Sequence, residues 1–178
     1  MQSFHAMKTG TKLAGGFGLL VALLLAVTAV TIWRIQSINT EVAEILDDRA
    51  VKVAIATDID QAINVQARAL RNMIIGHKDA EEVRASLDRI QKTSADITAL
   101  LAKLQPMLNT EAGRQAYKTI VDTRVAYAKG RDEVVALIQA GKVDEAGVSL
   151  LKTQRPAQTA YLEAVEGFSV SQAKLMTQ

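Results

Sequence analysis

The sequence predicts an all-α protein in which an N-terminal transmembrane helix continues into an up-down-up-down four-helix bundle. Three observations predict this fold. An uncharged apolar stretch lies near the N-terminus, apolar residues then recur at alternating spacings of four and three, and only two prolines occur in 178 residues. An alternation of four and three is a period of 3.5 residues, which places one stripe of side chains on the buried face of a bundle helix.

Leu13–Trp33 is the expected transmembrane helix, and residues 1–12 form a short cytoplasmic leader. The stretch has 21 residues and no charged side chain. At about 1.5 Å per residue it reaches about 31 Å, enough to cross a bilayer core of about 30 Å. Lys8 and Lys12 precede it and Arg34 follows it, which favours a cytoplasmic N-terminus and places the rest of the chain outside the cytoplasmic membrane.

A cleaved signal peptide is the alternative to a retained anchor, with Val27, Thr28 and Ala29 as a small-residue cleavage site. The apolar core of a secretory signal is about 7–15 residues long, and this stretch is longer. The helical pattern also continues past Trp33 without a break. Both features favour a retained anchor.

Four helices are expected in the domain that follows, residues 34–178, over about 34–76, 80–105, 111–140 and 143–178. Asp79 begins a capping-box-like pattern at the start of the second helix, and Pro106 ends or bends that helix because proline cannot donate to the helical ladder. Thr110 is the expected N-cap of the third helix, which ends at Gly141. The fourth helical stretch meets Pro156. Short turns between long helices predict antiparallel neighbours.

This topology predicts where the C-terminus lies. The first and third helices lead away from the membrane, and the second and fourth lead back to it. Gln178 is therefore expected beside the bilayer, and it stops inside a helical pattern with no cap. We expect the chain to be a fragment that a second membrane span follows in the intact protein.

Composition argues against several classes of function. From residue 35 onward the chain has 18 Lys and Arg against 19 Asp and Glu. A nucleic-acid partner is not expected, because such proteins usually present a basic face. The chain has no cysteine, and its only histidines are His5 and His77. No catalytic motif, phosphate-binding loop or metal-ligand pattern occurs, so we expect no enzyme, no cofactor and no metal site.

The third helix carries Arg124, Tyr127 and Arg131 at three successive core-type positions. Burying guanidinium groups without partners would cost several kcal/mol each. Asp122 and Glu133 are nearby but lie off the seam, so no acid is expected to neutralise the arginines there. Either the arginines reach out to water, or the layer is a wet cavity that takes an anion from solution.

Folding the chain at its turns estimates what lies level with these residues. Arg124 falls beside residues 93 and 94, Tyr127 beside residues 66–68, and Arg131 level with Arg71. The planar guanidinium suits a carboxylate bidentately, so the ligand expected is a small organic acid. The candidate ligand-binding residues are Arg68, Arg71, Thr93, Arg124, Tyr127 and Arg131.

The chain resembles the N-terminal half of a bacterial methyl-accepting chemotaxis protein with a four-helix-bundle ligand-binding domain. The resemblance rests on the basic leader, the single span running into the first helix, and the segments RALRNMIIGHKDAEE (68–82) and ALIQAGKVDEAGVSLL (136–151). It implies a periplasmic sensor in the bacterial inner membrane, usually a homodimer, that binds amino acids or organic acids. It also implies that binding shifts the last helix relative to the first, and that downstream signalling proteins are reached only through a cytoplasmic part that this chain lacks.

Three functional hypotheses follow. The first is a chemotaxis sensory domain for a di- or tricarboxylate. The second is the same bundle as the ectodomain of a sensor histidine kinase or a cyclase, which only the sequence beyond residue 178 would separate from the first. The third is a structural bundle with no ligand, which predicts no thermal shift with malate, citrate, succinate, benzoate or amino acids.

Overall fold

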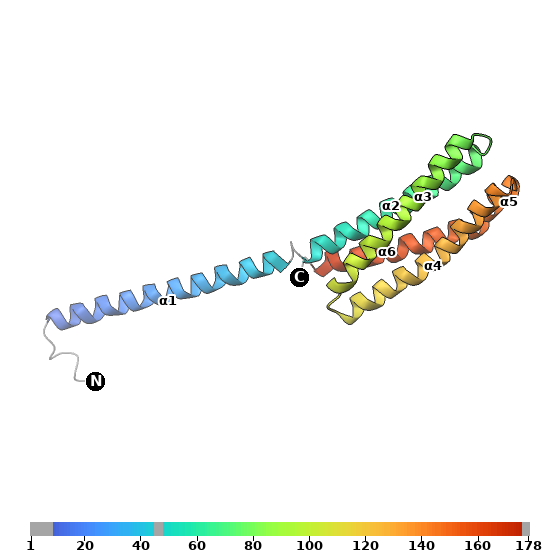
Figure 1. Cartoon of the computed structure of the whole chain (residues 1–178). Coiled ribbons are helices and arrows are strands. Elements are labelled where there is room, and N and C mark those ends of the chain that lie inside the picture. Colours follow the sequence, from blue (N-terminus) through green and yellow to red (C-terminus); the bar gives the residue numbers. More distant parts are fainter. Residues whose placement is uncertain (1–8, 45–47, 176–178) are drawn as a thin grey trace. The chain divides into compact units, whose positions relative to one another are not determined.

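A computed structural model describes residues 9–44 and 48–175, in which helices account for the regular structure and no strand occurs. The chain divides into two compact units, residues 1–45 and 46–178. The first unit holds one long helix and the second holds the bundle (Figure 1). The predicted all-α class is therefore confirmed.

The first unit contains α1, Thr9–Glu44. By length and composition its segment Gly16–Arg34 is the one described helix able to cross a membrane, and its side chains are exposed. The hydroxyls of Thr28 and Thr31 each donate to a backbone carbonyl four residues earlier, both at 2.8 Å. Both hydroxyls are thus satisfied without water, as a lipid environment requires.

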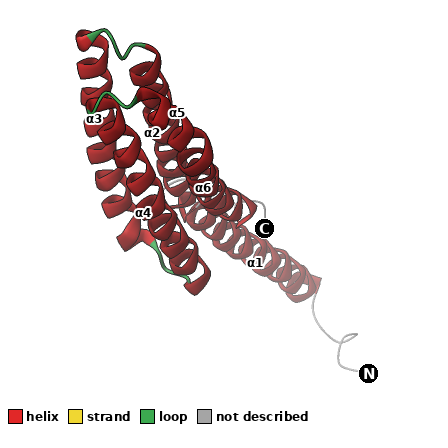
Figure 2. Cartoon of the chain, turned by 90° about the vertical axis from the view of Figure 1, so that its right-hand side faces the viewer, coloured by secondary structure: helices red, strands yellow, loops and turns green. Residues whose placement is uncertain are grey.

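The second unit contains four helical stretches joined by short turns (Figures 1 and 2). The expected continuity of its first helix with the apolar segment depends partly on residues 45–47, which lie outside the described residues. The bounds are α2 Ala50–Ile75, α3 Ala80–Leu104, α4 Glu111–Gln139, α5 Val143–Ser149 and α6 Arg155–Leu175, with short turns η2 Gln105–Met107 and η3 Leu150–Gln154.

Local sequence explains where these helices begin and end. The Asp79 carboxylate accepts from the backbone N–H of Glu81 at 2.9 Å and so caps α3. Thr110 accepts from the N–H of Gly113 at 3.0 Å and caps α4 in the same way. Gly141 follows α4 with φ +74°, a left-handed conformation that glycine adopts without strain.

Pro156 lies in the last helical stretch, and the backbone accommodates it with a π-helical turn instead of a break. The turn is η3, and the N–H of Arg155 donates to the carbonyl of Leu150, five residues back. Proline has no N–H, and its ring would clash with the carbonyl four residues earlier in an α-helix. A π-bulge is a common way to absorb such an interruption, and it is frequent at functional sites.

Two apolar cores fill the bundle. The first core, towards the α3–α4 turn, includes Ile59, Ile63, Leu104, Ile120 and Phe168. The second core, towards the α2–α3 and α4–α5 turns, includes Leu70, Met73, Ile90, Val134 and Ala146. Two buried polar side chains, Gln66 and Gln154, lie where the two cores meet. The expected polar layer is therefore present in the middle of the bundle.

The helices do not pack equally closely. α2 packs on α3 and α6, and α4 packs on α6, whereas the backbones of α3 and α4 make no comparable approach. Side chains bridge this wider seam instead. The Tyr117 hydroxyl, for example, donates to the Leu101 carbonyl at 3.4 Å. Long side chains are needed between α3 and α4, and arginines of α4 supply two of them.

Candidate ligand-binding site

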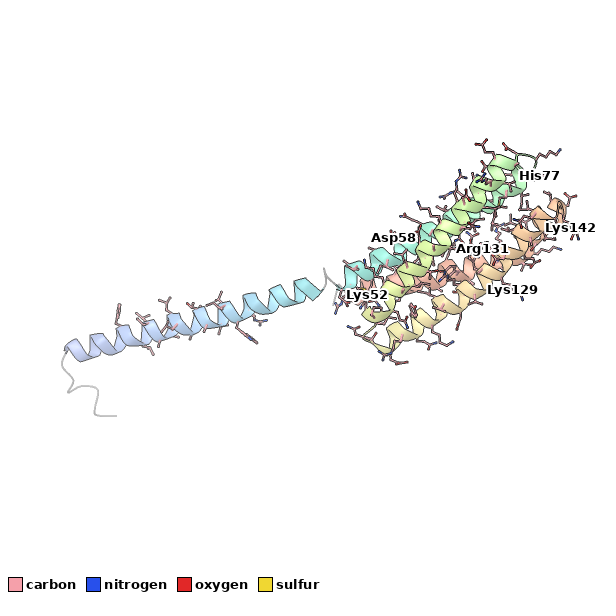
Figure 3. All side chains as sticks on the ribbon, viewed as in Figure 1. Lys52, Asp58, His77, Lys129, Arg131 and Lys142 are labelled. Carbon is pink, nitrogen blue, oxygen red and sulfur yellow. The ribbon has the colours of Figure 1, made fainter. Side chains whose placement is uncertain are left out.

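A cavity of about 70 Å³ lies inside the bundle where the two cores meet. It has room for about two water molecules at roughly 30 Å³ each. Among the described residues no acidic side chain lines it. Figure 3 shows Arg131 midway along the bundle. The lining residues are Gln66, Ser94, Ile97, Arg124, Tyr127, Ala128, Arg131 and Tyr161.

Arg131 crosses from α4 to α3 and α2. Its Nη1 donates to Ser94 Oγ at 2.8 Å and to Gln66 Oε1 at 3.5 Å. The Gln66 amide in turn donates to Ser94 Oγ at 3.0 Å, and that hydroxyl donates to the Ile90 carbonyl at 2.7 Å. Three helices are thus joined by one hydrogen-bonded group, which fixes the orientation of the guanidinium.

Arg124 reaches the same part of α3. Its Nη2 donates to Thr98 Oγ1 at 2.5 Å and to the Ser94 carbonyl at 3.2 Å. Arg124 and Arg131 therefore converge on Ser94, although they start about two turns apart on α4. The sequence places the backbone of Arg131 level with Arg71, whereas its guanidinium contacts Ser94 and Gln66. Side chains on a helix lean towards its N-terminus, so Arg131 reaches back towards the level of Arg124.

Two buried tyrosines face each other across α4 and α6, with ring centroids 5.6 Å apart. The Tyr127 hydroxyl donates to the Ile63 carbonyl at 3.5 Å, whereas the buried Tyr161 hydroxyl makes no hydrogen bond with a described residue. Burial raises the pKa of Tyr161 to about 12, against the opposing charge of Arg124. Burial also raises the pKa of Tyr127, which the charge of Arg131 opposes. Both phenols are therefore neutral hydrogen-bond donors.

Gln154 is a buried polar residue that the sequence did not single out. It ends the π-helical turn, and neither of its amide atoms makes a hydrogen bond with a described residue. Its amide still makes a looser polar contact with the Tyr127 hydroxyl, and this contact opposes the rise in the pKa of that tyrosine. A Cβ added at Gly130 would lie 2.5 Å from Gln154 Oε1. The backbone Cα of Gln154 would lie 3.4 Å from the same Cβ, so glycine at position 130 leaves room for the amide of Gln154 where it now lies.

The structure brings three of the six candidate residues to the cavity, Arg124, Tyr127 and Arg131. Thr93 does not line it, since its hydroxyl donates to the Arg89 carbonyl at 2.7 Å. Its neighbour Ser94 lines the cavity instead, about 100° further round the helix. The remaining two candidates, Arg68 and Arg71, are exposed on α2.

Arg71 belongs to a different surface groove, of about 400 Å³, between α2 and the last helical stretch. Arg155 and Leu162 also line this groove. Arg71 still lies near enough to Tyr127 to oppose the rise in its pKa. It therefore adds positive potential to the site without contacting the cavity.

The expectation that no acid neutralises these arginines is wrong, because Asp132 forms an ion pair with Arg131. Its Oδ1 accepts from Arg131 Nε at 2.8 Å and lies 2.7 Å from Arg131 Nη2. The Asp132 side chain is 66% exposed and that of Arg131 15% exposed. Asp132 was missed because it is off the seam, yet as the next residue it can reach round to its neighbour.

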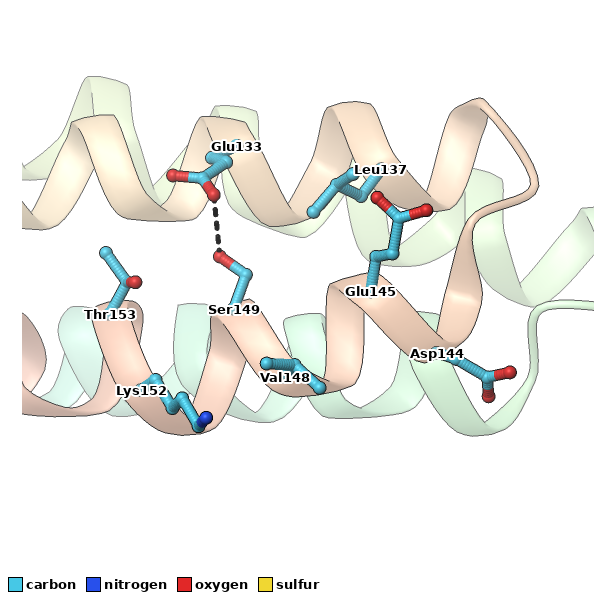
Figure 4. Close-up of a pocket in the computed structure, with 8 residues that line it drawn as sticks. All are labelled: Glu133, Leu137, Asp144, Glu145, Val148, Ser149, Lys152 and Thr153. Carbon is cyan, nitrogen blue, oxygen red and sulfur yellow. Dashed lines mark hydrogen bonds between the residues drawn. The ribbon is translucent and has the colours of Figure 1, made fainter.

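A larger groove of about 500 Å³ lies between α4 and α5, nearer the end of the bundle (Figure 4). Glu133 accepts from the Ser149 hydroxyl at 3.1 Å across it, while Asp144 points away from the other residues. Glu145 is paired with Lys142 at 3.1 Å. No three metal-ligating side chains come together anywhere in the described part of the chain. This groove does not contain the predicted residues.

A family described as "four helix bundle sensory module for signal transduction" matches residues 6–177. The chain belongs to this family, which confirms the resemblance to the sensory half of methyl-accepting chemotaxis proteins. It is a membrane-associated sensory module with one candidate apolar anchor in the described part of the chain, and its family is one of signal transduction, not of catalysis. A search of curated proteins finds no match to the chain.

Proposed function

We propose that this sensory module binds a small carboxylate anion in the cavity between α3 and α4, and that binding is read out as chemotaxis. One observation carries the proposal. The guanidinium groups of Arg124 and Arg131 converge on a partly open cavity, next to the Tyr161 hydroxyl, which makes no hydrogen bond with a described residue. Guanidinium and phenol donors together suit carboxylate oxygens. A buried hydroxyl without a partner is costly, and an anion there would supply the acceptor.

The volume of the cavity limits how much of a ligand it can hold. About 70 Å³ accommodates a carboxylate group but not a whole di- or tricarboxylate. The α3–α4 seam would have to widen for the rest of the molecule. Widening is feasible there because side chains, and not closely packed backbones, hold these two helices together.

The position of the site suggests how binding could be transmitted. Arg124 and Arg131 lie on α4, whereas Tyr161 lies on α6, the last helix. A ligand that contacts both helices would bias their relative position, which is the kind of differential contact that a shift in a conformational equilibrium requires. The periplasmic location, the homodimer and the chemotaxis output belong to the same proposal and rest on the family.

Calorimetric titration of the full chain in lipid nanodiscs tests the proposal, with malate, citrate, succinate, benzoate and amino acids as ligands. We expect at least one acid to bind, and Arg124→Ala or Arg131→Ala to weaken it about tenfold or more, the usual range for a lost hydrogen bond to a charged group. Arg114→Ala is the matched control, since Arg114 lies on the same helix and pairs with Glu111 at the surface.

Two results would count against the proposal. Equal losses in the Arg114 and Arg131 variants would contradict the site. Absence of binding by every acid in the panel would contradict the function and favour a bundle without a ligand.

A further inference from the structure

The ion pair between Arg131 and Asp132 occupies one edge of the guanidinium group, the edge formed by Nε and Nη2. Arg131 Nε and Nη2 both contact Asp132 Oδ1, and Nη1 donates to Ser94 and Gln66. Every nitrogen of the guanidinium therefore already has an acceptor. A carboxylate that binds arginine bidentately needs two parallel N–H groups at one edge.

We propose that Asp132 is an internal competitor for the anion. Its carboxylate holds the Nε–Nη2 edge of Arg131, and a ligand carboxylate has to displace it to bind there. This inference rests on the proposed function and adds how the affinity of the site is set. Asp132 would make the sensor respond only to anion concentrations high enough to overcome the internal ion pair.

Exposure and charge support this role. The Asp132 side chain is 66% exposed, so it can turn into water without losing packing. An ion pair with an exposed partner contributes little to stability, which makes displacement cheap for the fold. Two carboxylates at one guanidinium would also repel each other, so Asp132 weakens anion binding by its charge as well as by its position.

The competing explanation is that Asp132 only orients Arg131 for the ligand. The two explanations predict opposite results when the charge is removed. If Asp132 competes with the ligand, removing its charge makes the ligand bind more tightly. If Asp132 orients Arg131, removing its charge makes the ligand bind more weakly. Asp132→Asn keeps the size of the side chain and removes its charge. Asp132→Ala removes the acceptor as well.

The matched control is Asp122→Asn. Asp122 lies on the same helix, is 61% exposed and pairs with Lys118 at 2.6 Å, away from the cavity. We would titrate the full-length wild-type chain and the three variants in nanodiscs with succinate and with citrate. We expect Asp132→Asn and Asp132→Ala to bind about tenfold tighter than wild type, and Asp122→Asn to bind as wild type does. Far-UV circular dichroism checks that helicity is retained.

The possible outcomes separate this inference from the proposed function. Binding by wild type with equal or weaker binding by the Asp132 variants overturns the competitor role and leaves the site intact. Binding by wild type that becomes about tenfold tighter in both Asp132 variants supports the inference. Binding by the Asp132 variants alone supports competition by Asp132 but contradicts the proposed function of the wild-type site. No binding by any of the four proteins contradicts both.

Discussion

Each of the two hairpins of the bundle contains an almost fully buried glutamine in its middle, and the surroundings of these two glutamines differ. Gln66 on α2 and Gln154 at the end of the π-helical turn are each only 1% exposed. Gln66 donates to Ser94 and accepts from Arg131. Gln154 makes no hydrogen bond with a described residue. The α2–α3 hairpin thus buries an amide with close hydrogen-bond partners, and the α4–α6 hairpin buries one that has only a looser polar contact with Tyr127 among the described residues.

The backbone of the first hairpin is also more regular than the backbone of the second. α2 and α3 are regular α-helices in close contact. The second hairpin contains Gly130, the π-helical turn and Pro156, and the unbonded Tyr161 hydroxyl also belongs to it. Buried polar atoms without partners are rare in native proteins and mark places where free energy is given up for function. We infer that the first hairpin is a fixed frame and that the second is the part a ligand alters.

Substituting Gly130 tests the close approach within the second hairpin and should have the largest effect. We expect Gly130→Val to lower the free energy of unfolding by about 3 kcal/mol, because its side chain would overlap Gln154 and force the turn away from α4. Gly147→Val is the control, since a Cβ there meets no atom within 4 Å. Chemical denaturation followed by circular dichroism measures both. Equal losses would mean that the approach at Gly130 is unimportant.

Replacing each buried glutamine by leucine tests the comparison directly. Gln66→Leu should cost about 2 kcal/mol of unfolding free energy, since Ser94 and Arg131 each lose a hydrogen-bond partner. Gln154→Leu should stabilise the protein by about 1 kcal/mol, because it removes a buried amide whose two polar atoms make no close hydrogen bond with a described residue. The same denaturation measurement applies. Changes of the same sign in the two variants would show that the hairpins do not differ in this way.

Alkaline pH should destabilise the second hairpin because the buried Tyr161 is held in its neutral form. This effect should be smaller than those of the substitutions above. Its pKa is raised to about 12 in the folded protein, against about 10 in an unfolded chain. The stability from this difference is fully present below pH 10 and is lost as the pH rises towards 12, because the unfolded chain ionises first. At pH 11 we expect Tyr161→Phe to recover about 1 kcal/mol relative to its effect at pH 8.

Thermal melts at both pH values measure this difference. Tyr117→Phe is the matched control, since Tyr117 is a half-buried tyrosine of α4 whose hydroxyl bonds to the Leu101 carbonyl. An equal pH dependence in the two variants would contradict a special role for the buried phenol.

Half of the candidate site could be predicted from the sequence, because its signal is local. Arg124, Tyr127 and Arg131 interrupt an apolar seam within one helix, so the period of that helix alone shows that they face the interior. The other three candidates depended on residues of neighbouring helices. A rotation of α3 by one residue decides whether Thr93 or Ser94 lines the cavity. This rotation is set by packing among all four helices.

The sequence by itself determined the helices, their caps and the polar layer, because helical period, capping and turn chemistry act over a few neighbouring residues. Only the tertiary structure decided how these parts meet. The wide α3–α4 seam, the unbonded amide of Gln154 against Gly130, and the carboxylate of Asp132 on Arg131 all depend on distances between side chains. Those distances are set when the two apolar cores pack together, and no pattern within a single helix contains them.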